Sequence, residues 1–211
     1  PGTNEVPAIA NGANAQTCAF PPVVAWPGCS STLIHPRVVL SAAHCGGANT
    51  IRFGESSGGG SGQTVGVDYC RTNPDYSGNS DQGDDWAYCV LSQPVYDVPV
   101  IPPAVGCEAD FEIGQTVVMV GYGDASENGG FGTKRYAQTE VTNVMDDKGE
   151  IYVGPMAPNA CPGDSGGPLL IRFPDDSWRT VGIASTLAGD CGSEGAFNAY
   201  AMVRDAVPWI E

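Results

Sequence analysis

Ser165 lies within the segment GDSGGP, residues 163–168, and its surroundings favour nucleophilic chemistry. A serine hydroxyl becomes a nucleophile when a neighbouring base takes its proton, and the oxyanion that forms needs preorganised N–H donors. Glycines before and after the serine let the backbone turn sharply and direct successive N–H groups into one small space. The segment by itself is also compatible with a glycine-rich turn holding an incidental serine, so a base and an acid must be found elsewhere in the chain.

The segment also satisfies the looser G-x-S-x-G pattern of α/β-hydrolases. That pattern requires a helix after the serine and a histidine later in the chain. Here the apolar run PLLIRF follows, which predicts a strand, and no histidine lies C-terminal to Ser165. The α/β-hydrolase interpretation is therefore rejected.

The chain has two histidines, so the choice of base is narrow. His44 ends the segment VVLSAAH, a predicted strand followed by small residues, whereas His35 precedes Pro36 in a predicted turn. An imidazole with an ordinary pKa near 6.5 suits proton transfer at neutral pH. The base in turn needs a buried acid. Asp85 leads directly into the apolar run WAYCVL and is the candidate; Asp84 lies one residue further from that run and is expected to be solvated.

Composition restricts the partners of these groups. The chain has 211 residues, of which 24 are acidic and 9 basic, for a net charge of −15. Such a surface repels phosphate backbones and anionic lipids, so neither nucleic acid nor a membrane is expected as a partner. A solvated exterior is the simplest reason for the charge, and a preference for a basic macromolecular substrate is the alternative.

Eight cysteines indicate the compartment. They form an even set without a CxxC pair or a Cys/His spacing suited to zinc, so four disulfides in an oxidising compartment are predicted. We therefore expect a secreted protein, extracellular or periplasmic, with no metal site. No apolar run approaches the 18 residues of a membrane span.

Short apolar or alternating segments bounded by Gly, Pro, Asn or Asp recur along the chain and predict an all-β protein. A proline-rich segment at 98–104 is the predicted connection between two halves, and residues 204–210 are the one predicted helix. The predicted strands are residues 22–26, 31–34, 37–40, 50–53, 63–68, 86–91, 116–121, 136–144, 151–153, 168–173, 180–184 and 199–203.

Four motifs together resemble the trypsin/chymotrypsin family: LSAAHC at 40–45, DWA at 85–87, GYG at 121–123 and GDSGGP. They occur in the family's order and at similar spacings. The resemblance implies two packed six-stranded antiparallel β-barrels, at about 9–100 and 105–203, followed by a short helix at 204–211. It implies that His44, Asp85 and Ser165 form a catalytic triad across the two barrels.

The resemblance assigns further roles. The N–H groups of Gly163 and Ser165 would form the oxyanion hole, and Ser185 would support the aspartate and begin the strand that pairs with substrate. Cys29–Cys45 matches the disulfide beside the histidine, and Cys161–Cys191 the one closing the specificity pocket. Cys70–Cys89 is the next pairing, between cross-strand neighbours, and Cys18–Cys107 remains by elimination.

The N-terminus departs from the family pattern. Family members usually begin with Ile-Val-Gly-Gly, and the new ammonium group pairs with the acid preceding the nucleophile, here Asp164. The nearest match is Ile9-Ala10-Asn11-Gly12, preceded by eight residues. Residues 1–8 are thus a candidate activation segment. Two interpretations stay open: a zymogen with an incomplete oxyanion hole, or another group that orders this region.

The substrate pocket departs as well. Asn159 occupies the charge-selecting position and is neutral, Leu187 and Asn198 replace wall glycines, and Thr186 replaces a tryptophan. Bulky wall residues resemble elastases, so cleavage after Ala or a similar small uncharged residue is predicted. Glu55 aligns with a calcium ligand of some relatives, but the SSGGGSG that follows supplies no second carboxylate, and no calcium site is expected.

The sequence therefore predicts a monomeric serine endopeptidase that acts on peptides or proteins and needs no cofactor. Two alternatives stay open. One is a binding protein on a protease scaffold, because the pocket is obstructed and the extra N-terminal residues are present. The other is an esterase that uses the same triad.

Overall fold

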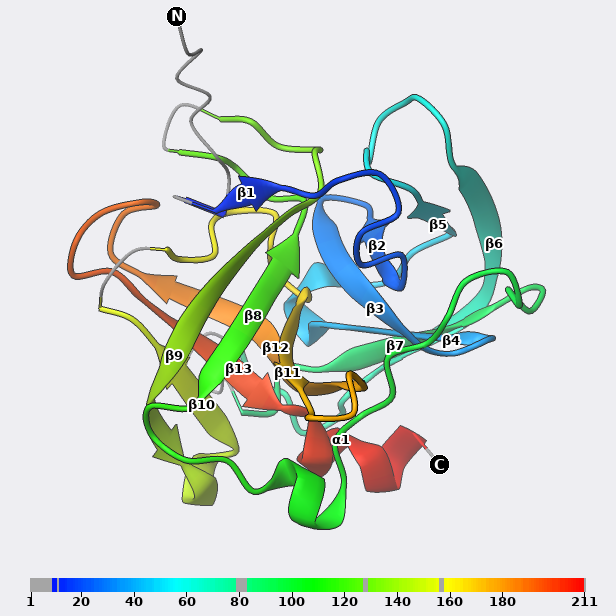
Figure 1. Cartoon of the computed structure of the whole chain (residues 1–211). Coiled ribbons are helices and arrows are strands. Elements are labelled where there is room, and N and C mark those ends of the chain that lie inside the picture. Colours follow the sequence, from blue (N-terminus) through cyan, green and yellow to red (C-terminus); the bar gives the residue numbers. More distant parts are fainter. Residues whose placement is uncertain (1–8, 11, 79–82, 127–128, 156–157, 211) are drawn as a thin grey trace, which may run out of the picture.

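The computed structural model describes residues 9–10, 12–78, 83–126, 129–155 and 158–210. Residues 1–8, which include the candidate activation segment, lie outside the described residues, as do Asn11 and Glu211. Two barrels lie side by side in Figure 1, with the first at the right and the second at the left.

Six antiparallel strands close the first barrel in the order β2-β3-β4-β7-β6-β5. The strands are β2 (Val23–Trp26), β3 (Cys29–His35), β4 (Val38–Ser41), β5 (Thr50–Phe53), β6 (Gln63–Thr72) and β7 (Ala87–Leu91). A short 3₁₀ helix, η1 (Ala43–Cys45), follows β4 and carries His44.

The second barrel follows the order β9-β10-β13-β12-β11-β8 and is closed by pairing between β8 and β9. Its strands are β8 (Thr116–Gly121), β9 (Arg135–Met145), β10 (Glu150–Val153), β11 (Pro168–Arg172), β12 (Trp178–Ala188) and β13 (Phe197–Met202). The predicted fold class, two six-stranded antiparallel barrels, is confirmed, and each of the twelve predicted strands overlaps an observed one.

The barrels share an apolar interface, and strand β2 shows why. All four of its residues are buried. Alternate side chains point to opposite faces of a strand, so both faces of β2 are covered. Val24 and Trp26 join the core inside the first barrel. Val23 and Ala25 pack in a separate cluster that also holds Tyr122 and other second-barrel residues. A continuous apolar run thus marks a strand covered on both sides.

The C-terminal helix α1 (Val203–Ile210) lies beneath both barrels in Figure 1. The sequence predicted this helix one residue shorter at its start. Trp209 makes edge-on contacts with Trp86 and Tyr88, at ring-centroid distances of 4.8 and 4.9 Å. Because Trp86 directly follows Asp85, the helix packs against the segment that joins the candidate acid to β7.

The start of the chain differs from the prediction. Ala10 bridges to Asn159, and a short additional strand, β1 (Ala13–Asn14), pairs with β9. Ala10 and the strand β1 therefore associate with the second barrel, whereas the first barrel was predicted to begin near residue 9. A two-residue strand has no periodicity for sequence analysis to detect.

Three predicted disulfides are confirmed: Cys29–Cys45, Cys70–Cys89 and Cys161–Cys191. The predicted Cys18–Cys107 bond is wrong, because both thiols are free and exposed. The Cys18 amide donates to Glu55, just after β5 of the first barrel. Cys107 lies in a 3₁₀ helix, η2 (Gly106–Ala109), where the next residue pairs with Arg179 of the second barrel. Elimination assumed that every cysteine pairs, and in the structure these two do not.

No helix among the described residues combines the length and apolar character needed to cross a membrane.

Candidate active site

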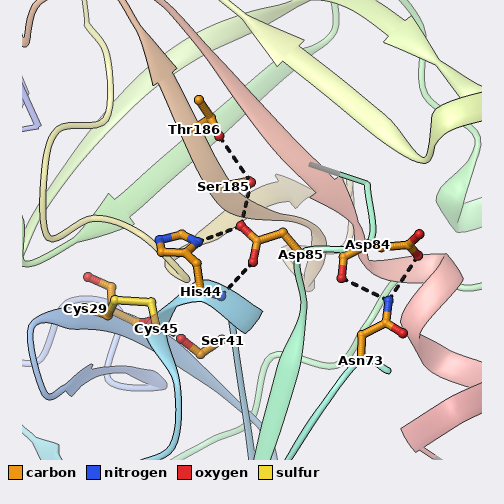
Figure 2. A network of polar contacts seen from close by, with 10 residues as sticks. Cys29, Ser41, His44, Cys45, Asn73, Asp84, Asp85, Ser185 and Thr186 are labelled. Atoms are coloured by element: carbon orange, nitrogen blue, oxygen red, sulfur yellow. Dashed lines mark hydrogen bonds and ion pairs between the residues drawn. A yellow bond between two sulfur atoms is a disulfide. The ribbon is translucent and has the colours of Figure 1, made fainter. Parts of the chain in front are cut away.

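His44 and Asp85 form a tight pair (Figure 2). The Nδ1 atom of His44 lies 2.6 Å from Oδ2 of Asp85, and the His44 backbone N–H donates to Oδ1 at 2.9 Å. Asp85 is 1% exposed, whereas the His44 side chain is 32% exposed. A buried carboxylate that accepts the Nδ1 proton fixes the imidazole tautomer and leaves Nε2 free to accept a proton.

A third group completes the environment of this carboxylate. Ser185 Oγ of β12 donates to Asp85 Oδ2 at 2.6 Å, and Thr186 Oγ1 lies 3.5 Å beyond (Figure 2). Ser185 belongs to the second barrel, so this bond joins the two barrels at the acid. The resemblance predicted this contact.

Asp84 lies outside this network. Its backbone carbonyl and its side chain both accept hydrogen bonds from Asn73 Nδ2, at 2.9 and 3.0 Å, and Figure 2 shows it pointing away from His44. The structure therefore places Asp85, and not its neighbour, beside the imidazole.

Ser165 comes from a turn between Cys161 and β11 that lies against the first barrel. Its carbonyl accepts a hydrogen bond from the Ser30 N–H at 2.8 Å, and Gly166 N–H donates to Ala184. Gly166 packs against the segment Ser41–Ala42, which directly precedes the helix carrying His44. Among the described residues, no hydrogen bond within 3.5 Å joins Ser165 Oγ to His44. Such contacts often tighten only in the substrate complex.

Gly166 is required by this close approach. Its φ is +78°, and a Cβ atom built there would lie 2.1 Å from Ser41 Oγ and 2.5 Å from the Ser30 carbonyl. Gly166→Ala is therefore expected to lower the free energy of unfolding by about 3 kcal/mol, of which roughly half is backbone strain and half is overpacking. Urea unfolding would measure the loss.

Gly114 is the matched control for that variant. Its φ is +88°, and a Cβ atom there would meet nothing within 4 Å. Gly114→Ala should cost only the strain, about 1–2 kcal/mol. Equal losses for the two variants would contradict the steric account of the Ser165 turn.

Two N–H groups beside Ser165 are available to a ligand. Within the described part of the chain, neither Gly163 N nor Ser165 N donates to a protein acceptor, although Asp164 N between them bonds to Cys161. Gly163 has φ +91°, a conformation that glycine adopts without strain. Alternate N–H groups freed in this way form a small anion-binding concavity.

The buried Asp164 side chain stabilises the turn that carries Ser165. Its side chain is 2% exposed, and its oxygens accept hydrogen bonds from Gly123 N at 2.7 Å and Cys161 N at 2.9 Å. Burial raises the pKa of Asp164 to about 7, against which these two bonds and the charge of Arg135 act. No cationic group of a described residue lies within 4 Å of this carboxylate.

A cavity of about 270 Å³ opens beside Ser165. Thr186, Leu187 and Asn198 line it, as predicted, together with Ser185. The Asn198 side-chain amide bonds to both backbone groups of Ala160, which also lines the cavity, at 2.8 and 3.0 Å.

Comparison with known proteins agrees with this geometry. The family model described as Trypsin matches residues 9–210. The chain belongs to the trypsin family. One similar protein is Serine protease 7 of Drosophila melanogaster, which is 26% identical over 86% of this chain and 56% of the relative. Another is a Trypsin-like protease of Streptomyces glaucescens, which is 29% identical over 83% of this chain and 70% of the relative. Phenoloxidase-activating enzyme 1 of Spodoptera litura is 29% identical over 87% and 58%. The chain thus spans a little over half the length of two of these relatives.

Asn159 lies away from the lining of the cavity of this trypsin-family chain. It is fully buried, with its amide bonded to Gly192 N and Ser193 O. Asn159 is 0% exposed and does not line the cavity, so the residue at the charge-selecting position has no access to a ligand there. Sequence comparison by position could not detect this burial.

Ser30 is a site residue that sequence analysis missed. Its hydroxyl donates to the Gly163 carbonyl and accepts from Tyr122 N, both at 3.0 Å. Together with the bond from its N–H to the Ser165 carbonyl, these contacts tie the nucleophile turn to the first barrel. Ser30 precedes the predicted strand at 31–34, and a small serine there gives no signal of such a role.

Proposed function

We propose that this trypsin-family chain is a secreted serine endopeptidase that cleaves peptide bonds after small uncharged residues through an acyl-enzyme. The observation that carries the proposal is the buried Asp85 carboxylate, which holds His44 Nδ1 at 2.6 Å and accepts the Ser185 hydroxyl. A carboxylate desolvated in this way stabilises an imidazolium.

The reaction follows from the proposed triad. Ser165 Oγ attacks the scissile carbonyl carbon and its proton passes to His44 Nε2, while the carbonyl oxygen becomes an oxyanion held by Gly163 N–H and Ser165 N–H. His44 then gives the proton to the leaving amine, and the C–N bond breaks to leave an ester on Ser165. A water molecule attacks that ester, again with His44 as base, and releases the acid product.

A fluorophosphonate probe tests the assembled site. The chain beginning at Ile9 should be labelled at Ser165, and the same chain with Ser165→Ala should not be labelled. An unlabelled chain beginning at Ile9 would instead favour a binding protein on a protease scaffold.

An extended peptide suits the site better than a small ester. Strand β12 pairs with β11 through residues 178–183 only, whereas its pairing with β13 continues to Ala188. One edge of residues 185–188 is therefore free of strand partners among the described residues. A substrate backbone can add to such an edge as another strand. Turnover of simple esters with no peptide cleaved would favour the esterase alternative.

The proposed preference for small residues rests on Leu187 and Asn198, which line the cavity where the resemblance expects glycines. A larger side chain would meet Leu187 and the Asn198 amide, which is held in place by two hydrogen bonds to the Ala160 backbone. Leu187→Gly is expected to raise the kcat/KM ratio of a Phe substrate to an Ala substrate by about 10- to 200-fold, since packing of this size discriminates by that amount. Peptides that differ only in the residue before the cleaved bond would measure it.

A matched variant keeps the wall occupied: Leu187→Val should leave the preference for Ala in place. Faster cleavage after Arg than after Ala by the wild-type chain would contradict the proposed specificity.

We also propose an extracellular or periplasmic location and action as a monomer. Three disulfides support the oxidising compartment, and the triad comes from a single chain. We further propose that cleavage before Ile9 activates the chain, as argued in the Discussion.

A further inference from the structure

A second cavity lies between the barrels, and it shares no lining residue with the cavity beside Ser165. It has a volume of about 270 Å³ and is bordered by the β2–β3 hairpin tip (Pro27 and Gly28), by Arg52 and Thr64 of the first barrel, and by Phe131 of the second. The proposed catalytic roles leave this cavity without a function.

Two lining residues, Phe131 and Gly28, connect the cavity to Gly163 and to the disulfide next to His44. A Cβ atom built on Gly163 would lie 2.5 Å from the Phe131 ring, so this ring covers the glycine proposed for the oxyanion hole. On the other side, Gly28 precedes Cys29, whose disulfide partner Cys45 follows His44. A substrate that pairs with residues 185–188 on its acyl side must continue past Gly163 and His44, towards this cavity, after the scissile bond.

Arg52 gives the cavity a fixed positive charge. Its guanidinium donates to the carbonyls of Ser56, Gly59 and Gly60 at 2.9–3.1 Å, and its Nη1 lies 3.5 Å from Thr64 Oγ1. All of these acceptors are neutral, and within the described part of the chain no carboxylate lies within 4 Å of it.

Of the seven arginines, Arg52, Arg71 and Arg135 form no ion pair with a described carboxylate. Four other arginines each pair with a carboxylate at 2.6–2.8 Å; they are Arg37, Arg172, Arg179 and Arg204. The loop carbonyls fix the Arg52 side chain in place, so little rotamer freedom is lost when an anion binds.

We infer that this cavity is the leaving-group subsite and that Arg52 selects an acidic side chain within the first three residues after the scissile bond. Phe131 forms the apolar wall of the subsite. The inference rests on the proposed function, since it assigns substrate contacts to the same site. The net charge of −15 disfavours the binding of acidic peptides in general. The fixed Arg52 guanidinium attracts an acidic side chain at one position of the substrate.

Peptide pairs test the inference directly. Each pair carries Ala before the scissile bond and differs only by Glu or Gln at the first, second or third position after it. The wild-type chain should show a kcat/KM about 5- to 20-fold higher for Glu at one of these positions, as expected for a charge-assisted hydrogen bond at a partly exposed site. The ratio should fall as salt is raised.

Three variants separate recognition from loop structure. Arg52→Gln should bring the ratio of kcat/KM for the Glu and Gln peptides to about 1, whereas Arg52→Lys should keep part of the Glu preference. Arg172→Gln is the matched control, because it removes the same charge from a surface ion pair of the second barrel and should change nothing. Phe131→Ala should slow cleavage of the Glu and Gln peptides alike.

A Glu preference that is absent, or that survives in Arg52→Gln, overturns the inference. Equal losses on Glu and Gln peptides in both Arg52 variants also overturn it, because they indicate a role confined to loop structure. If the chain beginning at Ile9 cleaves no peptide and Ser165 is not labelled, the proposed function is contradicted as well. Cleavage of the peptides without a preference for Glu contradicts only the proposed leaving-group subsite.

Discussion

Replacing Asp85 with Asn is expected to lower kcat by about 10⁴-fold at neutral pH while the fold is retained. The amide group can donate as well as accept, so the His44 ring is no longer forced to carry its proton on Nδ1. In the other tautomer Nε2 is protonated and cannot take the Ser165 proton. The imidazolium would also lose the charge that stabilises it. Steady-state kinetics on an Ala peptide would measure the loss.

Asp84→Asn is the matched control, because Asp84 is adjacent in sequence but bonds to Asn73 instead of His44. This variant should keep wild-type kcat. Thermal unfolding of both variants would separate loss of chemistry from loss of structure. A similar loss of kcat in the two variants, or full activity in Asp85→Asn, would contradict the proposed triad.

A chain that begins at Ile9 is expected to show a kcat/KM about 10²- to 10³-fold higher than the chain beginning at Pro1. Ile9 is buried in the second-barrel core, and Ala10 N–H bonds to the Asn159 carbonyl. The new ammonium group would therefore lie close to the turn that carries Asp164. An ion pair there would offset the burial of that carboxylate and fix the Gly163 and Ser165 N–H groups in place.

The free energy of unfolding is also expected to depend on pH differently in the two chains. Burial raises the pKa of Asp164 to about 7, from 3.8 in the unfolded chain, so the folded state holds the proton more tightly. Asp164 therefore makes the free energy of unfolding fall as pH rises from about 4 to 7, by up to roughly 4 kcal/mol. In the chain beginning at Ile9, the ammonium favours the ionised carboxylate, and this fall should shrink.

Urea unfolding at several pH values, with kinetics on both chains, would test the two expectations together. A chain that begins at Ala10 is the matched control, since its ammonium is one residue away from the required place. Asp164→Asn in the chain beginning at Ile9 should remove the gain. Equal activity of the chains beginning at Pro1 and Ile9 would mean that another group orders the turn.

Local sequence determined a large part of this fold. Strand periodicity and turn residues are short-range properties, so all twelve barrel strands and the helix were predicted, with small errors at their ends. The residues flanking Asp85 were informative for the same reason: an apolar strand directly after it implied burial, and the carboxylate is 1% exposed. Asp84, one residue further out, bonds elsewhere.

Only the tertiary structure decided which residues meet across the barrels. Ser30 bonds to the nucleophile turn from 133 residues away, Phe131 covers Gly163, and Asn159 is buried outside the cavity lining. Cys18 and Cys107 stay apart although counting paired them. Such contacts depend on how two closed barrels pack, and no periodicity within a single strand encodes them.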